Sequence, residues 1–218
     1  MKVFEVAAIL GFNSAIAAVL GLIRFRKVEP AYQPFLFIVC LGFINHSLSL
    51  VLIRYFRSNA INGNIYVLVE SLLYIWQFSN WGLFKKKKKT ALMLAALLLG
   101  VWIIDNILVH NFRVLNSGFR IFSSFMMVFL AINQVTSLIT RAKMNLLKNA
   151  IFIICSGMLI YFSYKAFIDV FFLVELDPGI GVIHYIYAIL VGINFFVNLI
   201  FAWAVLWIPK KKPSMLSS

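Results

Sequence analysis

The sequence predicts an all-α membrane protein, a bundle of seven transmembrane helices. Of its 218 residues, 63% are hydrophobic and 12% are charged, whereas a soluble domain carries about 25% charged residues. Seven apolar windows are each long enough to cross a hydrocarbon core, which takes roughly 20 helical residues. They lack the two-residue alternation of membrane strands. Helices are therefore the structure that can satisfy the backbone in lipid.

The predicted helices follow one another with short loops. They lie near 3–23, 35–53, 65–84, 91–109, 119–139, 150–174 and 182–208. The first ends in a basic patch and is too long for the apolar core of a signal peptide, so we expect it to remain as a spanning helix. Because no loop can hold a soluble domain, residues 1–218 are predicted to form a single membrane domain.

Basic residues predict the orientation of the bundle, because lysine and arginine collect in cytoplasmic loops. Alternate loops on one side hold 14 of the 20 basic residues, namely Arg24, Arg26, Lys27, Lys85 to Lys89, Arg141, Lys143, Lys148 and Lys210 to Lys212. The loops on the other side hold only Arg54, Arg57 and Arg113. The N-terminus is thus predicted outside and the C-terminus in the cytoplasm, with the protein in the cell inner (plasma) membrane.

The isoelectric point near 10.0 has a membrane explanation. The runs Lys85–Lys89 and Lys210–Lys212 adjoin helix ends, where they can contact anionic lipid headgroups. We therefore expect the lipid bilayer, and not a nucleic acid, to be the partner of these charges.

Two stretches share letters, "FIVCLGFINHS" (Phe37 to Ser47) and "FIICSGMLIYF" (Phe152 to Phe162), at an offset of 115 residues. The helices before them end in "LIRFRK" and "LITRAK", at an offset of 116. One interpretation is a parallel 3+1+3 repeat with the fourth helix as connector, as in SWEET-type sugar transporters. The other is chance similarity between apolar helices. In either case Gly42 and Gly157 are expected to allow close helix packing.

Ionisable side chains at mid-membrane cost about 2.5–3.5 kcal/mol each and point to functional sites. At about 100° per residue, polar side chains of the third, sixth and seventh helices form narrow stripes that should face the bundle interior. Most of the charges fall in the outer half of the membrane, which predicts a polar pocket open to the outside. The candidate ligand- or ion-binding residues are Tyr66, Glu70, Tyr74, Gln77, Tyr161, Lys165, Asp169, His184, Asn194 and Asn198.

Lys165 and Asp169 are spaced to pair along one helix, and Glu70 can offer Lys165 a second carboxylate. The alternatives are that these residues only join helices or extend to the membrane surface. Glu5 and Arg120, nearer to helix ends, are expected at the interface. His46 is expected to be a packed, hydrogen-bonded histidine.

The sequence lacks the residues that several kinds of chemistry require. The seventh helix has no lysine before Lys210 for a retinal Schiff base, and the three histidines are isolated on separate segments, so no zinc site is predicted. No GxSxG or glycine-rich phosphate motif occurs. We therefore expect neither an enzyme nor a cofactor.

Three segments carry a family resemblance: "NIYVLVESLLYIWQF" (64–78), "FIICSGMLIYFS" (152–163) and "INFFVNLIFAWAVLW" (193–207). They resemble an uncharacterised family of small seven-helix bacterial inner-membrane proteins. The resemblance covers nearly the whole chain, implies no established activity, and points to Tyr66, Glu70, Gly157, Tyr161 and Asn198. The chain has no Pro-Gln dipeptide, which separates it from the PQ-loop transporters.

Three functions fit these observations. The first is a transporter of a small polar or ionic solute, with Gln77, Asn133, Asn194 and Asn198 extending a polar path inward. The second is a sensory module that binds a small molecule and acts through a partner membrane protein. The third is a structural or assembly factor.

Overall fold

The computed structural model describes residues 9–85, 88–141, 145–174 and 179–211, and within these ranges the chain is helical with no β-strand. The principal helices are α2 (Ser14–Arg24), α3 (Gln33–Phe56), α4 (Ala60–Asn80), α5 (Lys88–Ile103), α6 (Ser117–Arg141), α7 (Ala150–Leu173) and α8 (Gly179–Trp207). The 3₁₀ turns Pro30–Tyr32 and Leu146–Lys148 precede α3 and α7, and the π-helical segment Ile104–Val109 continues α5. The seven predicted helices are confirmed.

Five segments are long and apolar enough to cross a membrane: Pro30–Phe56, Lys89–Val109, Ser117–Thr140, Ala150–Phe171 and Ala188–Trp207. The protein is thus a multi-pass membrane protein by length and composition. α4 is long enough but carries polar side chains along its length, Glu70 and Gln77 among them.

The first helix differs from its prediction. Residues 9–11 are helical, the chain turns at Phe12 and Asn13, and α2 begins at Ser14. The predicted single helix over 3–23 is therefore broken within the part that the structure describes, and residues 1–8, with Glu5, lie outside that part.

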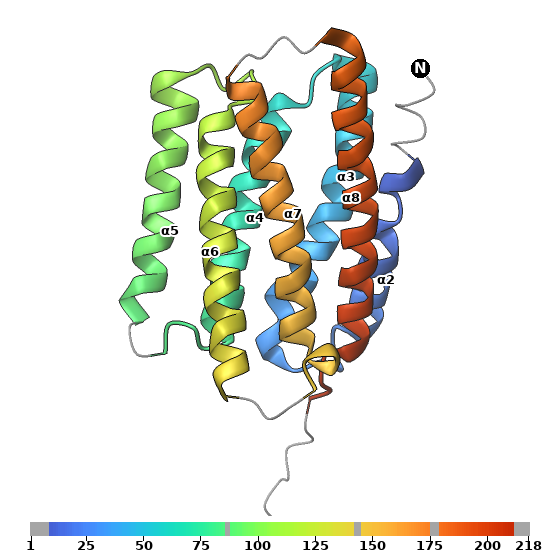
Figure 1. Ribbon diagram of the computed structural model, residues 1–218, viewed down its shortest axis with the longest axis vertical. Coiled ribbons are helices and arrows are strands. Elements are labelled where there is room, and N and C mark those ends of the chain that lie inside the picture. The colour runs from blue at the N-terminus through green and yellow to red at the C-terminus, as the bar shows by residue number, and fades with distance from the viewer. Residues whose placement is uncertain (1–8, 86–87, 142–144, 175–178, 212–218) are drawn as a thin grey trace, which may run out of the picture.

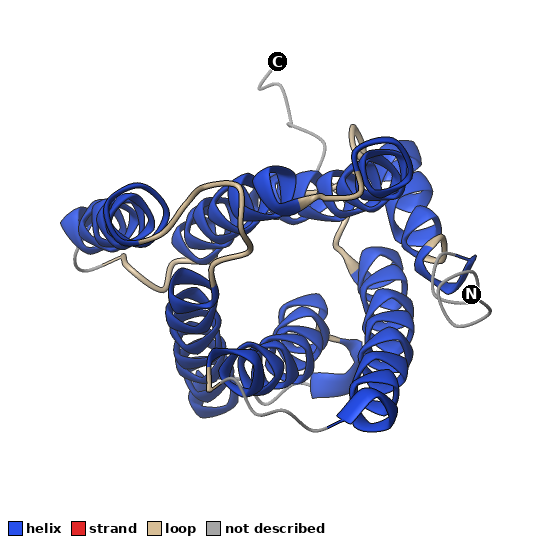
Figure 2. Ribbon diagram, turned by 90° about the horizontal axis from the view of Figure 1, so that it is seen from above, coloured by secondary structure: helices blue, strands red, loops and turns tan. Residues whose placement is uncertain are grey.

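The helices surround a central space in sequence order (Figures 1 and 2). α2 packs on α3, α3 on α4, α4 on α6, α6 on α7, α7 on α8, and α8 returns to α2. α5 lies outside this ring, at the outer edge of the bundle (Figure 1), and packs mainly on α4. Along the chain, α5 separates the first three helices of the ring from the last three. The 3+1+3 repeat stays a prediction.

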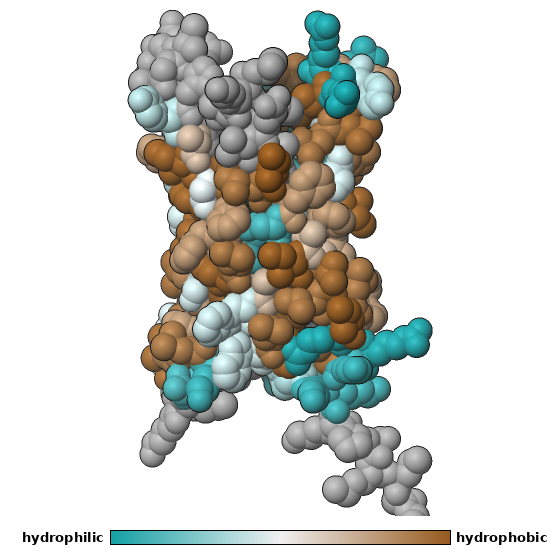
Figure 3. Space-filling view, turned by 90° about the vertical axis from the view of Figure 1, so that its right-hand side faces the viewer, coloured by the Kyte–Doolittle hydropathy of each residue, from teal (hydrophilic) through white to brown (hydrophobic). Residues whose placement is uncertain are grey.

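The predicted basic loops share one end of the bundle. α2, α4, α6 and α8 all finish at the lower end in Figure 1. Figure 3 shows hydrophilic residues gathered there, beneath a largely apolar belt. The basic loops thus lie together, and the cytoplasmic location of this end stays a prediction.

The ring closes at this basic end through Arg24. Its guanidinium donates hydrogen bonds to the Val205 carbonyl and, at 2.9 Å, to the Ile208 carbonyl. These carbonyls end α8 and have no partner within the helix. Val28 and Lys210 form an antiparallel bridge beside it. The first and last helices are therefore joined by both backbone and side-chain bonds.

Close packing of α7 on α8 depends on Gly157. A Cβ there would lie 2.6 Å from the Phe201 ring, closer than side chains normally approach. The expectation for Gly42 is wrong, because a Cβ there would meet only the Tyr66 hydroxyl at 3.6 Å, an ordinary contact.

Substitution of Gly157 tests this packing. We expect Gly157→Ala to lower the free energy of unfolding by about 1–3 kcal/mol through overpacking, despite the higher helix propensity of alanine. Gly192→Ala, on α8, is the matched control because a Cβ there meets no described atom within 4 Å. Thermal unfolding of both variants in detergent is the measurement, and equal stability of the two would contradict the packing argument.

Orientation can be tested with single cysteines at two exposed positions, Ser58 between α3 and α4 and Lys211 after α8. In intact cells, a membrane-impermeant maleimide should label Ser58→Cys, and Lys211→Cys only after permeabilisation, because basic loops stay cytoplasmic. The parent protein, with Cys155 buried and Cys40 half-buried, gives the background. The reverse labelling pattern would invert the predicted topology.

Candidate functional site

A cavity of about 250 Å³ lies inside the ring, between the first helix, α3, α4, α7 and α8. This volume is far above the minimum that a cavity needs to hold one water molecule. Six of the predicted site residues line it: Tyr66, Glu70, Tyr74, Tyr161, Asn194 and Asn198. The helical stripes on α4, α7 and α8 thus meet at one place.

Glu70 is the central polar group of the cavity and is only 3% exposed. The Tyr66 hydroxyl, one helical turn earlier, donates a 2.9 Å hydrogen bond to Oε1. Lys165 Nζ on α7 lies 3.5 Å from Oε2. Among the described residues, no group hydrogen-bonds Oε2 itself. One oxygen of a buried carboxylate therefore has an ion-pair partner but no hydrogen bond.

The predicted pairing of Lys165 with Asp169 along α7 is not the one in the structure. Asp169 Oδ1 accepts a 2.9 Å hydrogen bond from Arg120 Nε on α6. Lys165 instead faces Glu70, with Nζ 5.4 Å from the centre of the Tyr161 ring. The two carboxylates attract one cation each, which separates the charges into two pairs on three helices.

Arg120, expected at the membrane interface, lies near the start of α6 and pairs with a residue of the neighbouring helix. Its depth in a membrane stays a prediction. Its side chain is 23% exposed and is bonded to the buried Asp169. The sequence did contain a signal for this pairing, namely the position of each residue along its predicted helix. Arg120 starts α6 and Asp169 ends the antiparallel α7, so their charges lie at the same level.

The opposite wall is built where the first helix breaks. Asn13 donates a 2.7 Å hydrogen bond to the Phe195 carbonyl and accepts one of 3.0 Å from Asn198. The His46 ring occupies the space beside Gly11 that a Cβ would fill, and it lines the cavity. Asn13 and Gly11 were not predicted as site residues, although "GFNS" (11–14) interrupts an apolar run.

Gln77 lies outside the cavity lining, toward the basic end. Its Oε1 accepts a 2.6 Å hydrogen bond from the Phe35 amide, and its Nε2 donates one of 2.6 Å to the Ala31 carbonyl. Both ends of the amide are therefore used to fix the start of α3. The side chain of His184 lies outside the part of the chain that the structure describes.

The predicted polar path toward the basic end is closed in this structure. Phe35 and Phe201 pack edge to face with their ring centres 5.4 Å apart, and Phe201 also lines the cavity. Asn133 is exposed and bonds to the Phe129 carbonyl of its own helix. The cavity thus ends on aromatic rings between its polar lining and Gln77.

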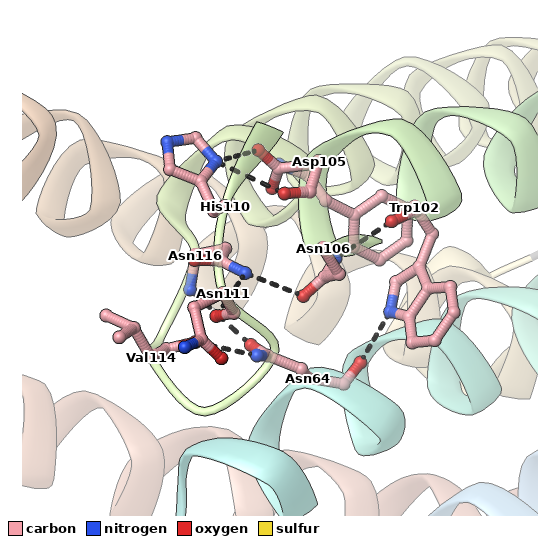
Figure 4. Close-up of polar contacts among 9 residues, drawn as sticks. Asn64, Trp102, Asp105, Asn106, His110, Asn111, Val114 and Asn116 are labelled. Atoms are coloured by element: carbon pink, nitrogen blue, oxygen red, sulfur yellow. Dashed lines mark hydrogen bonds and ion pairs between the residues drawn. The ribbon is translucent and has the colours of Figure 1, made fainter. Parts of the chain in front are cut away.

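A second polar cluster, shown in Figure 4, lies at the other end of the bundle. Asp105 in the π-helical segment accepts a 2.7 Å hydrogen bond from the Phe119 amide and lies 3.0 Å from His110 Nδ1. Asn116 donates to Asn106, and Asn64 to the Val114 carbonyl. Because a carboxylate at a helix N-terminus satisfies free amides, this cluster anchors the start of α6 to α4 and α5.

The donor atoms around the cavity do not form a metal site within the described residues, where no group of three or more metal-ligating side chains converges. Comparison of the chain with models of known protein families, with curated proteins and with solved structures finds no match. The geometry of the cavity is thus the basis for assigning a function, and the family resemblance stays a prediction.

The Arg120–Asp169 pair can be tested by removing one charge or both. Asp169→Asn leaves a poorly solvated guanidinium without its counter-ion, and we expect a loss of about 3–5 kcal/mol in stability. The double variant Arg120→Met/Asp169→Asn should recover much of this loss, because it removes both desolvation penalties. Thermal unfolding in detergent compares the two. A double variant no more stable than Asp169→Asn would contradict this account.

Proposed function

We propose that the protein binds a small polar or charged solute in the cavity beside Glu70 and transports it across the membrane. The observation that carries this proposal is a buried carboxylate, Glu70, that lines the cavity and whose Oε2 accepts no hydrogen bond from a described residue. A buried polar group of this kind costs free energy, and a bound solute would recover part of it.

A comparison of the two polar clusters of the molecule supports a binding role for the residues around Glu70. In the cluster of Figure 4, the polar side chains bond to one another and to backbone groups of neighbouring segments. The Glu70 cluster includes three atoms without hydrogen-bond partners in the described chain, Glu70 Oε2, Lys165 Nζ and Asp169 Oδ2. A purely structural factor would gain nothing from this incomplete bonding beside an open volume.

Transport needs a second conformation in which the cavity opens toward the basic end. The groups that close this end are few: the edge-to-face contact of Phe35 with Phe201, and the two hydrogen bonds of Gln77 to the start of α3. A shift of the start of α3 away from α8 would separate the rings. The closed basic end would then be one of two states of the transport cycle.

The same closed end favours a sensory module as the second candidate. A cavity that never opens toward the cytoplasm can still bind a solute. A shift of α3 and α8 on binding would then be passed to a partner membrane protein.

We also place the protein in a bacterial inner membrane with its basic end in the cytoplasm, by the family resemblance and the distribution of lysine and arginine. Lys85–Lys89 and Lys210–Lys212 would contact anionic lipid there.

Solute binding at Glu70 is tested by thermal-shift screening of the purified protein with small amines, amino acids, sugars and carboxylates, followed by uptake into liposomes. We expect at least one solute to stabilise the protein and to be taken up, and Glu70→Gln to abolish both effects. Glu29→Gln is the matched control, because Glu29 is exposed and remote from the cavity lining. Binding without uptake would favour the sensor, and binding unaffected by Glu70→Gln would place the site elsewhere.

A further inference from the structure

The charge of the cavity lining selects among solutes. Among the described residues that line the cavity, Glu70 is the one acidic residue, and neither lysine nor arginine is present. Around it lie the aromatic rings of Tyr66, Tyr74 and Tyr161. A carboxylate with aromatic side chains around it can hold an ammonium group, through ion pairing and cation–π attraction together. Anions are repelled by the same carboxylate.

The protein already places an ammonium group at this carboxylate. Lys165 Nζ lies 3.5 Å from Glu70 Oε2 and within 5.6 Å of the centres of the Tyr161 and Phe162 rings. Lys165 does not belong to the cavity lining, so it approaches Glu70 from behind, on the α7 side. A cationic solute in the cavity would thus compete with Lys165 for one carboxylate.

A second acceptor for Lys165 lies one helical turn further along α7. Asp169 is spaced i+4 from Lys165, which places it within reach of the lysine side chain. Its Oδ1 is bonded to Arg120, whereas its Oδ2 is buried and accepts no hydrogen bond from the described residues. Lys165 can therefore leave Glu70 without losing contact with a carboxylate.

We propose that the cavity takes a small organic monocation with an ammonium head, and that binding of this cation to Glu70 displaces Lys165 toward Asp169 Oδ2. This inference rests on the proposed solute site and names its substrate class. The displaced lysine would share Asp169 with Arg120. Movement of a side chain on α7 when the cavity fills then couples solute binding to the packing of α7 on α4 and α6.

Inorganic cations fit the site less well. Ca²⁺ sites are built mainly from carboxylate oxygens and take six to eight oxygens in all, whereas Glu70 is the one carboxylate among the described residues of the lining. A carboxylate-bearing zwitterion would bring its own negative charge beside Glu70. The aromatic lining and the single carboxylate are matched by a cation whose charge is surrounded by carbon.

Choline and its neutral isostere 3,3-dimethyl-1-butanol provide the probe, because they share a shape and differ in charge. Binding is measured by calorimetry on the purified protein in detergent, with glycine betaine as the zwitterionic comparison. We expect choline to bind, the isostere and betaine to bind at least about tenfold more weakly, and Glu70→Gln to weaken choline by about tenfold or more. Equal binding of choline and its isostere, or tighter binding of betaine, would overturn the cation assignment.

The displacement of Lys165 is tested by a double-mutant cycle. Lys165→Met removes the internal competitor and should tighten choline binding, and Lys165→Gln serves the same purpose if the methionine variant does not fold. Arg120→Met/Asp169→Asn removes the alternative acceptor and should weaken choline binding when Lys165 is present but not in the Lys165→Met background. Equal effects in the two backgrounds would overturn the displacement.

These measurements separate this inference from the proposed transport. Choline binding that depends on Glu70 without uptake into liposomes would remove the transport function and retain the cation site. Uptake of a neutral or anionic solute through a site that excludes choline would retain transport and remove the cation site.

Discussion

The cost of placing ionised groups inside an apolar bundle is the constraint on which the interior depends. Glu70, Lys165, Arg120 and Asp169 come from three helices, and each is held near an opposite charge. An unpaired charge would be destabilising by several kcal/mol, so α4, α6 and α7 must keep the register that brings the pairs together. Yet the pairing is incomplete, since three of the buried polar atoms accept or donate no hydrogen bond within the described chain. The charges are thus held in register, while part of their hydrogen-bonding capacity is unused among the described residues.

The two polar regions of the molecule differ in how completely their side chains are hydrogen-bonded. Around Asp105, the hydrogen-bonding groups of three segments satisfy one another and join helices. Around Glu70, aromatic rings and an open volume take the place of partners. Natural chains pair nearly all their buried polar groups, and exceptions call for an explanation. A site that must admit and release a solute is one such explanation, because complete internal satisfaction would leave no free energy for a solute to gain.

Hydropathy was sufficient to locate the seven helices along the chain. Helical periodicity then identified Tyr66, Glu70, Tyr161 and Asn198 as residues that face the interior of the bundle. Pairing was harder to predict. The spacing of Lys165 and Asp169 favours a bond along one helix, but the choice was decided by Arg120 on a neighbouring helix, whose position depends on tertiary packing. The role of Gln77 was missed for the same reason, because its partners are backbone atoms of the α3 start. The interruption "GFNS" (11–14) marks the break of the first helix in the sequence, but the partners of Asn13 on α8 are set by tertiary packing.

The bonds that join the first and last helices have a consequence for the synthesis of the chain. Arg24 and the backbone around Val28 find their partners on Val205, Ile208 and the segment at Lys210, which leave the ribosome only after more than 170 intervening residues. During synthesis Arg24 therefore lacks its α8 partners until the last helix has been made. The cavity around Glu70 likewise lacks the part of its lining that α8 contributes, so its full lining exists only in the completed chain.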